Sequence, residues 1–313
     1  MRVFARQMTE RMKAVAAAGA VAAFWLAVWV FAAALVAQPL ILPGPGAVVV
    51  ALLRLVCDAG TWAILAGSGA RILGGLALAA VCGGLLAGIS SRSQAFVRLV
   101  APALSFVKAT PVACVVVLLL IWLGSARVSI AAVFLMALPG VYFSLVEGLT
   151  QADKPLEQMF RLHGVRGWRL FCAHTWREVL PFVLSCARAV IGMSWKAGVA
   201  AELIGMATGT VGERIYQAKL LIETADLLAW TVLVVAASRA CERVLVWLLR
   251  ASGPAAWRAA VWAHGRGTRG RSGDPAGAGA AAELALAVGD RAPWAPALDG
   301  LWCSTCLRVG VSV

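Results

Sequence analysis

Long apolar runs separated by short polar segments make up most of this chain. Six runs extend over about 20 or more residues, at 14–37, 64–90, 97–124, 128–149, 179–206 and 227–249. A helix rises about 1.5 Å per residue, so each run is long enough to cross the roughly 30 Å hydrocarbon layer of a bilayer. The pattern predicts an all-α polytopic membrane protein with six transmembrane helices.

Proline and glycine mark the places where these helices end or bend. Pro43, Gly44 and Pro45 separate the first run from a short amphipathic helix that we expect on the membrane face. Pro111 and Pro139 lie inside the third and fourth runs, where each removes a backbone hydrogen bond and bends the helix. Both are hinge candidates for a moving bundle, although ordinary membrane helices carry such prolines as well.

The longest polar interruption runs from Gln151 to Pro181, between the fourth and fifth runs. A helix is predicted over 154–163, followed by a break at Gly164, a second apolar face beginning at 168–171, and a new helix starting at Pro181. The first helix has one apolar face, formed by Leu156, Met159, Phe160 and His163. Such an element can dock into a groove on a soluble partner. The alternative is a loop that lies on lipid headgroups.

Composition and charge support a membrane location and orient the chain. The chain is 61% hydrophobic and 14% charged, whereas soluble domains average roughly 45–50% apolar and 25% charged residues. The net charge of +13 is no sign of nucleic-acid binding, because the basic residues flank the apolar runs. By the positive-inside rule, both termini and the 151–181 segment lie in the cytoplasm.

Three regions follow from this reading. Residues 1–13 form a basic cytoplasmic N-terminus, 14–250 the transmembrane domain, and 251–313 a cytoplasmic tail whose Ala, Gly, Pro and Arg content predicts disorder. The tail holds Cys303 and Cys306, but no second pair accompanies them, and the three histidines form no cluster. We therefore predict no metal site.

The chain lacks the motifs of the common catalytic sites. It has no phosphate-binding loop of the Gly-x-x-x-x-Gly-Lys-Ser/Thr type, no nucleophile elbow and no His-Glu-x-x-His. We expect that it is not an enzyme and binds no cofactor of its own.

Three ionisable residues lie within the predicted fifth helix: Arg188, Lys196 and Glu202. A charge at the bilayer centre costs roughly 2.5–3.5 kcal/mol on insertion scales, so each requires a reason. We take all three as candidates for the lining of a transport pathway, in which Lys196 would stabilise an anion in transit. The alternatives for Lys196 are a structural ion pair with another helix and snorkelling to the interface.

The 151–181 segment resembles the coupling loop of binding-protein-dependent ABC importer permeases, which reads Glu-Ala-Ala, three residues, then Gly. Gly164 matches the glycine, and Leu180-Pro181 matches a Leu-Pro found in many members. The triplet is here Gln158-Met159-Phe160, with Glu157 one place early. The resemblance implies that this coupling element, at about 152–177, contacts an ATPase.

The likeness extends over about residues 42–250 to the nitrate/sulfonate/taurine-type branch of these permeases. It rests on several motifs in order: Leu42-Pro43 with Pro45, Arg71 with Gly75, Lys108 to Pro111, Trp122 to Gly124, and the set Arg188, Gly192, Trp195 and Glu202. The resemblance implies an inner-membrane permease subunit that pairs as a homodimer. Its partners would be two cytoplasmic ABC ATPases, which use ATP and Mg, and an extracytoplasmic binding protein that delivers a small anion.

Two other functional classes stay open from the residues alone. A self-powered secondary transporter would show internal repeats and coupling carboxylates within its helices. A membrane scaffold would need no patterned cytoplasmic element.

Overall fold

The computed structural model describes residues 2–165, 167 and 170–268, and every regular element within them is helical. The elements are α1 (Arg2–Val36), α2 (Pro45–Cys57), α3 (Ala59–Ser90), α4 (Gln94–Ala109), α5 (Val112–Leu123), α6 (Ser125–Gln151), α7 (Lys154–Leu162), the π-helical turn η1 (Phe171–Thr175), α9 (Trp176–Gly205), α10 (Val211–Leu220) and α11 (Thr224–Thr268). The chain divides into two units, and the features below belong to the first, which ends at Pro254.

Four helices are long and apolar enough to cross a membrane: α1, over its Gly19–Val36 stretch, α3, α6 and α9. A fifth span results if α4 and α5 are counted together. The sixth predicted span, 227–249, lies within α11, which is not among these candidates. α11 also continues to Thr268, past the predicted start of the tail at residue 251. The rest of that tail lies outside the described residues.

The third predicted span is not a continuous helix. Between α4 and α5 the chain bends by 102°. Thr110 and Pro111 are both extended at the bend, with ψ of 132° and 130°. Proline lacks the N–H that would continue the helix and disfavours helical backbone in the residue before it. Pro139, by contrast, lies inside the unbroken α6.

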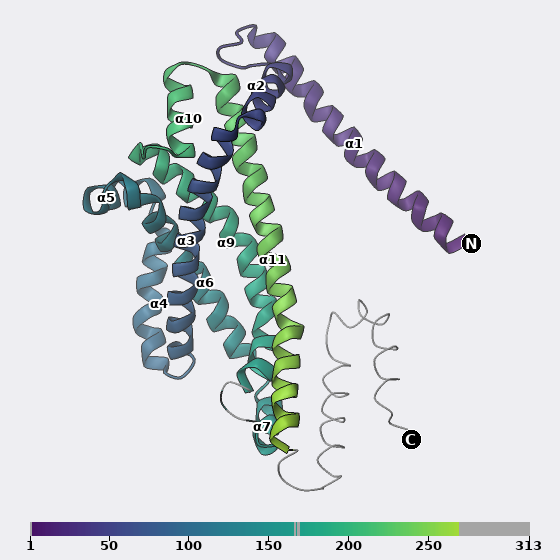
Figure 1. Cartoon of the computed structure of the whole chain (residues 1–313), viewed down its shortest axis with the longest axis vertical. Coiled ribbons are helices and arrows are strands. Elements are labelled where there is room, and N and C mark those ends of the chain that lie inside the picture. Colours follow the sequence, from purple (N-terminus) through teal and green to yellow (C-terminus); the bar gives the residue numbers. More distant parts are fainter. Residues whose placement is uncertain (1, 166, 168–169, 269–313) are drawn as a thin grey trace. The chain divides into compact units, whose positions relative to one another are not determined.

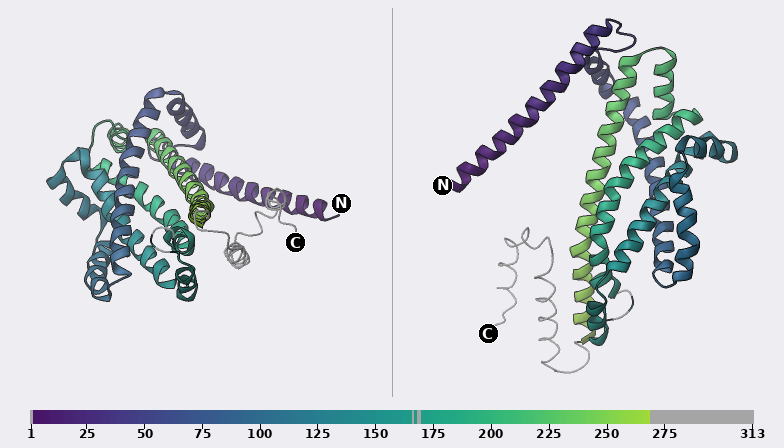
Figure 2. Two further views of the ribbon diagram at one scale, coloured as in Figure 1. Left: turned by 60° about the horizontal axis from the view of Figure 1, so that its bottom comes forward. Right: turned by 180° about the vertical axis from the view of Figure 1, so that it is seen from behind.

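The core of the bundle forms where α6 packs between α3 and α9 (Figures 1 and 2). Its buried side chains come from all three helices and include Ile72, Ala79, Val133, Tyr142 and Ile191. Glycine allows the closest approach: a Cβ on Gly75 of α3 would lie 2.5 Å from the carbonyl oxygen of Ile130 in α6. Small residues at such contacts allow helices to pack closely in lipid.

The α2 helix is present, as expected for the short helix after the proline-rich break. Pro45 lies in its first turn, where a missing N–H costs nothing. The indole Nε1 of Trp29 in α1 donates a hydrogen bond to the carbonyl oxygen of Pro43 at 3.2 Å. None of the apolar Gly19–Val36 stretch of α1 is buried within this single chain.

Candidate functional site

The predicted coupling element begins with a well-capped helix, α7. The carboxylate of Asp153 accepts a hydrogen bond from the Leu156 N–H at 3.2 Å and so caps the first turn. One turn later, Arg161 donates to the Glu157 carboxylate at 2.7 Å, an i,i+4 pair on the helix surface. These local interactions explain why so short a polar segment is helical.

Gly164 ends this helix in the predicted way. Its φ is +77°, in the left-handed region where a side chain is strained. The reversal is closed by hydrogen bonds from Gly164 N–H to the Arg161 carbonyl and from Val165 N–H to the Phe160 carbonyl. The chain therefore turns sharply between α7 and η1.

Phe160 and His174 join the two halves of the element. Both side chains are buried, and their rings stack with centroids 5.8 Å apart. Leu156 and Met159 are half-buried on the same side of α7, whereas His163, predicted to lie on this apolar face, is exposed.

The opposite side of α7 carries an exposed apolar side chain that the sequence did not lead us to expect. Leu162 is 87% exposed, although it is a large apolar side chain. It lies 200° around the helix from Phe160 at 100° per residue. The position of this leucine on the polar side of an amphipathic helix is the sequence signal that could have indicated its exposure.

The second half of the element leads directly into α9. Leu170 is buried and Phe171 exposed, while Trp168 lies outside the described residues. The prediction that Pro181 starts the next helix is wrong, because α9 already begins at Trp176 and contains Pro181. Membrane helices accommodate a proline where neighbouring groups satisfy the freed carbonyl. Leu180, beside it, is half-buried.

The fifth predicted span, α9, has two sharply different faces. One is buried against α3 and α6 and carries Ile191, Ser194, Trp195, Gly198 and Glu202. The other is exposed and carries Pro181, Ser185, Arg188, Met193 and Lys196. A Cβ added to Gly192, on this second side, would meet no atom within 4 Å. Arg188 and Lys196 therefore share a face that this chain alone leaves uncovered.

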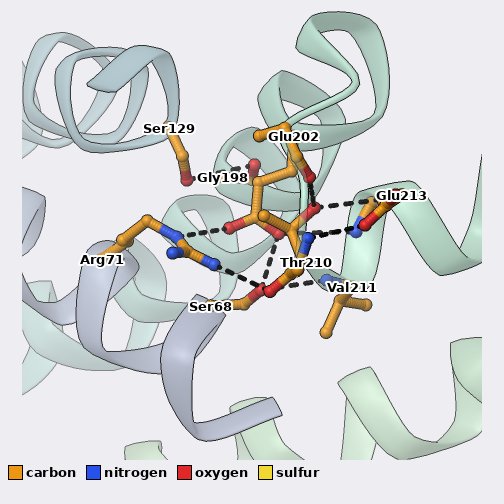
Figure 3. Close-up of polar contacts among 11 residues, drawn as sticks. Ser68, Arg71, Ser129, Gly198, Glu202, Thr210, Val211 and Glu213 are labelled. Atoms are coloured by element: carbon orange, nitrogen blue, oxygen red, sulfur yellow. Dashed lines mark hydrogen bonds and ion pairs between the residues drawn. The ribbon is translucent and has the colours of Figure 1, made fainter. Parts of the chain in front are cut away.

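Glu202 lies on the buried face, so the structure separates it from Lys196 and Arg188. Its side chain is 0% exposed and accepts hydrogen bonds from Ser68 Oγ at 2.8 Å and Arg71 Nε at 3.2 Å (Figure 3). It also accepts one from the Gly212 N–H at 3.4 Å. This carboxylate is the centre of a polar network that joins α9 to α3 and α10.

The network holds the short helix α10 against the bundle. The hydroxyl of Ser68 accepts from the Val211 N–H at 3.0 Å while donating to Glu202. At the same helix start, the Thr210 hydroxyl accepts a hydrogen bond from the Glu213 N–H at 3.1 Å, and the Glu213 carboxylate accepts one from the Gly209 N–H at 2.6 Å. Ser68 and Arg71 are three residues apart and so share a face of α3, which is the sequence signal that could have paired them with a buried carboxylate.

The two hinge candidates occupy different environments. Pro111 is exposed at the bend between α4 and α5. Pro139 is less than 2% exposed within α6, and a Cβ on the adjacent Gly140 would lie 2.9 Å from Val190 of α9. No group of three His, Cys, Asp or Glu side chains gathers to hold a metal ion within the part of the chain that the structure describes.

Comparison with known proteins gives one family and several relatives. The family model described as "Binding-protein-dependent transport system inner membrane component" matches residues 80–256, more than half of the chain. The protein of Bacillus subtilis named as the aliphatic sulfonates transport permease SsuC is 28% identical over 209 residues, covering 65% of this chain and 74% of that protein. The SsuC of Escherichia coli is 27% identical, covering 59% and 70%. The bicarbonate transport system permease CmpB of Synechococcus elongatus is 23% identical, covering 58% and 65%.

Proposed function

We propose a working arrangement for this chain, which belongs to the family of binding-protein-dependent transport system inner membrane components. It is a transmembrane permease subunit of an ABC importer. The family is a transport family rather than an enzyme family, and a self-powered transporter or a scaffold is not favoured.

For the topology we propose six spans with both termini in the cytoplasm of the cell. The bent pair α4 and α5 would count as one broken span, and residues 227–249 of α11 as the sixth. Support comes from the positive-inside rule, because the basic segments at 1–13, 92–98 and 151–181 then share one side. In this arrangement α7 and η1 form the cytoplasmic coupling helix region.

The motor would be a pair of ABC ATPases that bind ATP and Mg, while this chain binds no cofactor. They would dock on α7, where Leu162 offers an exposed apolar knob beside the Gly164 turn. An apolar side chain on a short helix can enter a groove on a soluble partner. The stacked Phe160 and His174 rings then transmit movement of α7 to η1 and α9 as one body.

The pathway would lie between two copies of this chain, along the exposed face of α9. Lys196 is uncovered on that face, and lipid is an unfavourable neighbour for a charge. A second copy that covers this face would create a central passage. Arg188 lies at the edge of the same face, where α9 meets α11. Alternating access would follow from bending at Pro111 and Pro139.

The substrate class we propose is a small anion, delivered by an extracytoplasmic binding protein. Support comes from the positive charge of Lys196 and from relatives named for sulfonates and bicarbonate. A fixed ammonium favours an anion over a neutral solute of similar size. The observation that carries the proposal is the exposed cationic face of α9, inside the region matched by the family model.

Uptake by the reconstituted importer tests this. With radiolabelled taurine, nitrate and bicarbonate as probes, Lys196→Ala is expected to lower uptake of the transported anion at least tenfold, and Lys196→Arg to retain most of it. Lys219→Ala, which removes an exposed cation from α10, is the matched control. If Lys196→Ala and Lys219→Ala transport all three anions alike, Lys196 does not face the pathway.

A further inference from the structure

A groove between α9 and α11 lies apart from the coupling element and from Lys196. Its volume is about 310 Å³, and it is lined by Arg188, Glu242, Arg243, Val246, Trp247 and Arg250. The α11 residues fall at positions i, i+1, i+4, i+5 and i+8 of one helix, so they form one side of the groove. Arg188 of α9 forms the other.

The groove is strongly positive. Three of its six lining residues are arginines, and its one carboxylate, Glu242, accepts a hydrogen bond from Arg239 outside the groove at 3.3 Å. Within the described part of the chain, no carboxylate lies within ion-pair distance of Arg188, Arg243 or Arg250. Guanidinium groups in this number attract a ligand with a concentrated negative charge, above all a phosphate.

An apolar stripe continues from the groove along the outer side of α11. It is formed by Val232 and Val235, which are 45% and 55% exposed, and ends at Trp247, which is 67% exposed. At about 100° per residue these three side chains fall within about 120° of the helix circumference. Exposed valines there suit the acyl chains of a bilayer, and tryptophan suits the level of the headgroups. Over its part before Pro254, α11 runs toward the end of the bundle at which α7 lies (Figure 1).

We propose that this groove binds the phosphate of an anionic phospholipid in the leaflet next to the coupling element, with an acyl chain on the α11 stripe. Basic pockets between membrane helices bind acidic headgroups by this chemistry. The apolar stripe selects a lipid over a soluble anion, because a soluble anion would gain nothing from it. The inference does not depend on which solute is transported or on the ATPase.

Native mass spectrometry of the purified full-length protein tests the site. The protein is taken from nanodiscs that contain phosphatidylglycerol and phosphatidylcholine in equal amounts, and retained phosphatidylglycerol is counted. Each of Arg243→Gln and Arg250→Gln is expected to weaken phosphatidylglycerol binding about fivefold. Arg98→Gln, which removes an exposed arginine from α4, is the matched control and is expected to change nothing.

A variant that is expected to strengthen lipid binding distinguishes a specific site from a general loss of folding. Glu242→Gln removes the only negative charge of the groove and is expected to strengthen phosphatidylglycerol binding. The proposal is overturned if the arginine variants retain as much phosphatidylglycerol as Arg98→Gln. It is also overturned if inorganic phosphate at millimolar concentration displaces the lipid, which indicates a soluble ligand. Loss of a dimer in Arg243→Gln and Arg250→Gln would instead assign the groove to a second copy.

Discussion

The carboxylate of Glu202 and the guanidinium of Arg71 form an ion pair between α9 and α3, with 3.2 Å between Oε1 and Nε. Glu202 is fully buried, while the Arg71 side chain is 29% exposed. The same guanidinium lies 3.5 Å from the carbonyl oxygen of Gly209, which precedes α10. One buried charge thus ties together the three segments that meet at this end of the bundle.

Removing the carboxylate is expected to destabilise the protein strongly. Glu202→Ala leaves the Ser68 hydroxyl and the Nε–H of Arg71 without their acceptor, and breaking a buried pair costs about 3 kcal/mol. Thermal unfolding of the detergent-solubilised protein measures the loss. Glu213→Ala, which removes a half-buried capping carboxylate at the start of α10, is the comparison and is expected to cost less, about 1 kcal/mol. Equal melting temperatures for both variants would show that the buried pair does not stabilise the fold.

Two adjacent glycines of α3 provide a test of the helix packing. Gly75→Ala places a Cβ 2.5 Å from the Ile130 carbonyl oxygen, and backbone cannot yield easily, so a loss of about 1–3 kcal/mol is expected. Gly74→Ala meets nothing within 4 Å and is expected to be neutral or slightly stabilising, since alanine favours the helix. Thermal unfolding of the two variants side by side distinguishes them. The reverse order would contradict the packing of α3 on α6.

The buried hydroxyls of Ser90 and Tyr142 lie 2.8 Å apart and link α3 to α6. Tyr142→Phe and Ser90→Ala each leave one buried hydroxyl unpaired, so each is expected to cost about 1–2 kcal/mol. The double variant leaves no unpaired hydroxyl, so its loss of unfolding free energy is expected to be smaller than the sum of the losses in the two single variants. A double-mutant cycle on unfolding free energies measures this, and strict additivity would show that the bond contributes nothing.

Asp58 caps the first turn of α3 through the N–H groups of Gly60 and Thr61. Hydrogen bonds from the Gly60 backbone and the Thr61 side chain lower the pKa of the Asp58 carboxyl below its usual 3.8. A depressed pKa in the folded state contributes stability that is present above the unfolded pKa and lost as pH falls through the folded value. Asp58→Asn is therefore expected to weaken the acid dependence of unfolding below about pH 4. If the stability of Asp58→Asn falls with decreasing pH as steeply as that of the unsubstituted protein, the carboxylate of Asp58 does not stabilise the start of α3.

Much of the architecture could be predicted from the spacing of apolar residues. Helices of the right type appear at all six runs, and Gly164 ends α7 where its lack of a Cβ allows a positive φ. The break between α4 and α5 at Pro111 was harder to predict, because a proline in an apolar run can either kink a helix or end it. Pro102 and Pro181 are carried inside helices, whereas Pro111 follows an extended Thr110 and separates α4 from α5.

The candidate site was predicted less completely, because helix faces depend on the neighbours of each helix. From the sequence, Lys196 and Glu202 are both charged residues within one predicted span, where burial of a charge is unfavourable. In the structure Lys196 is exposed, whereas Glu202 is paired with Arg71 on another helix. The residues around Glu202 give no sign of Arg71, which is 131 residues away in the sequence, and the spacing of Ser68 and Arg71 in α3 is the only signal. Likewise, Phe160 is buried against His174 of a later segment, so this contact could not be inferred from the α7 sequence alone.

The central claim is that α7 delivers the force of an ABC ATPase to this permease. Photo-crosslinking in transporting membranes, with p-benzoylphenylalanine in place of Leu162, tests it most directly. The expected result is an adduct with an ABC ATPase, identified by mass spectrometry, from position 162 and none from Leu85, a 65% exposed leucine of α3. Absence of an ATPase adduct from position 162, while uptake continues, would contradict the account.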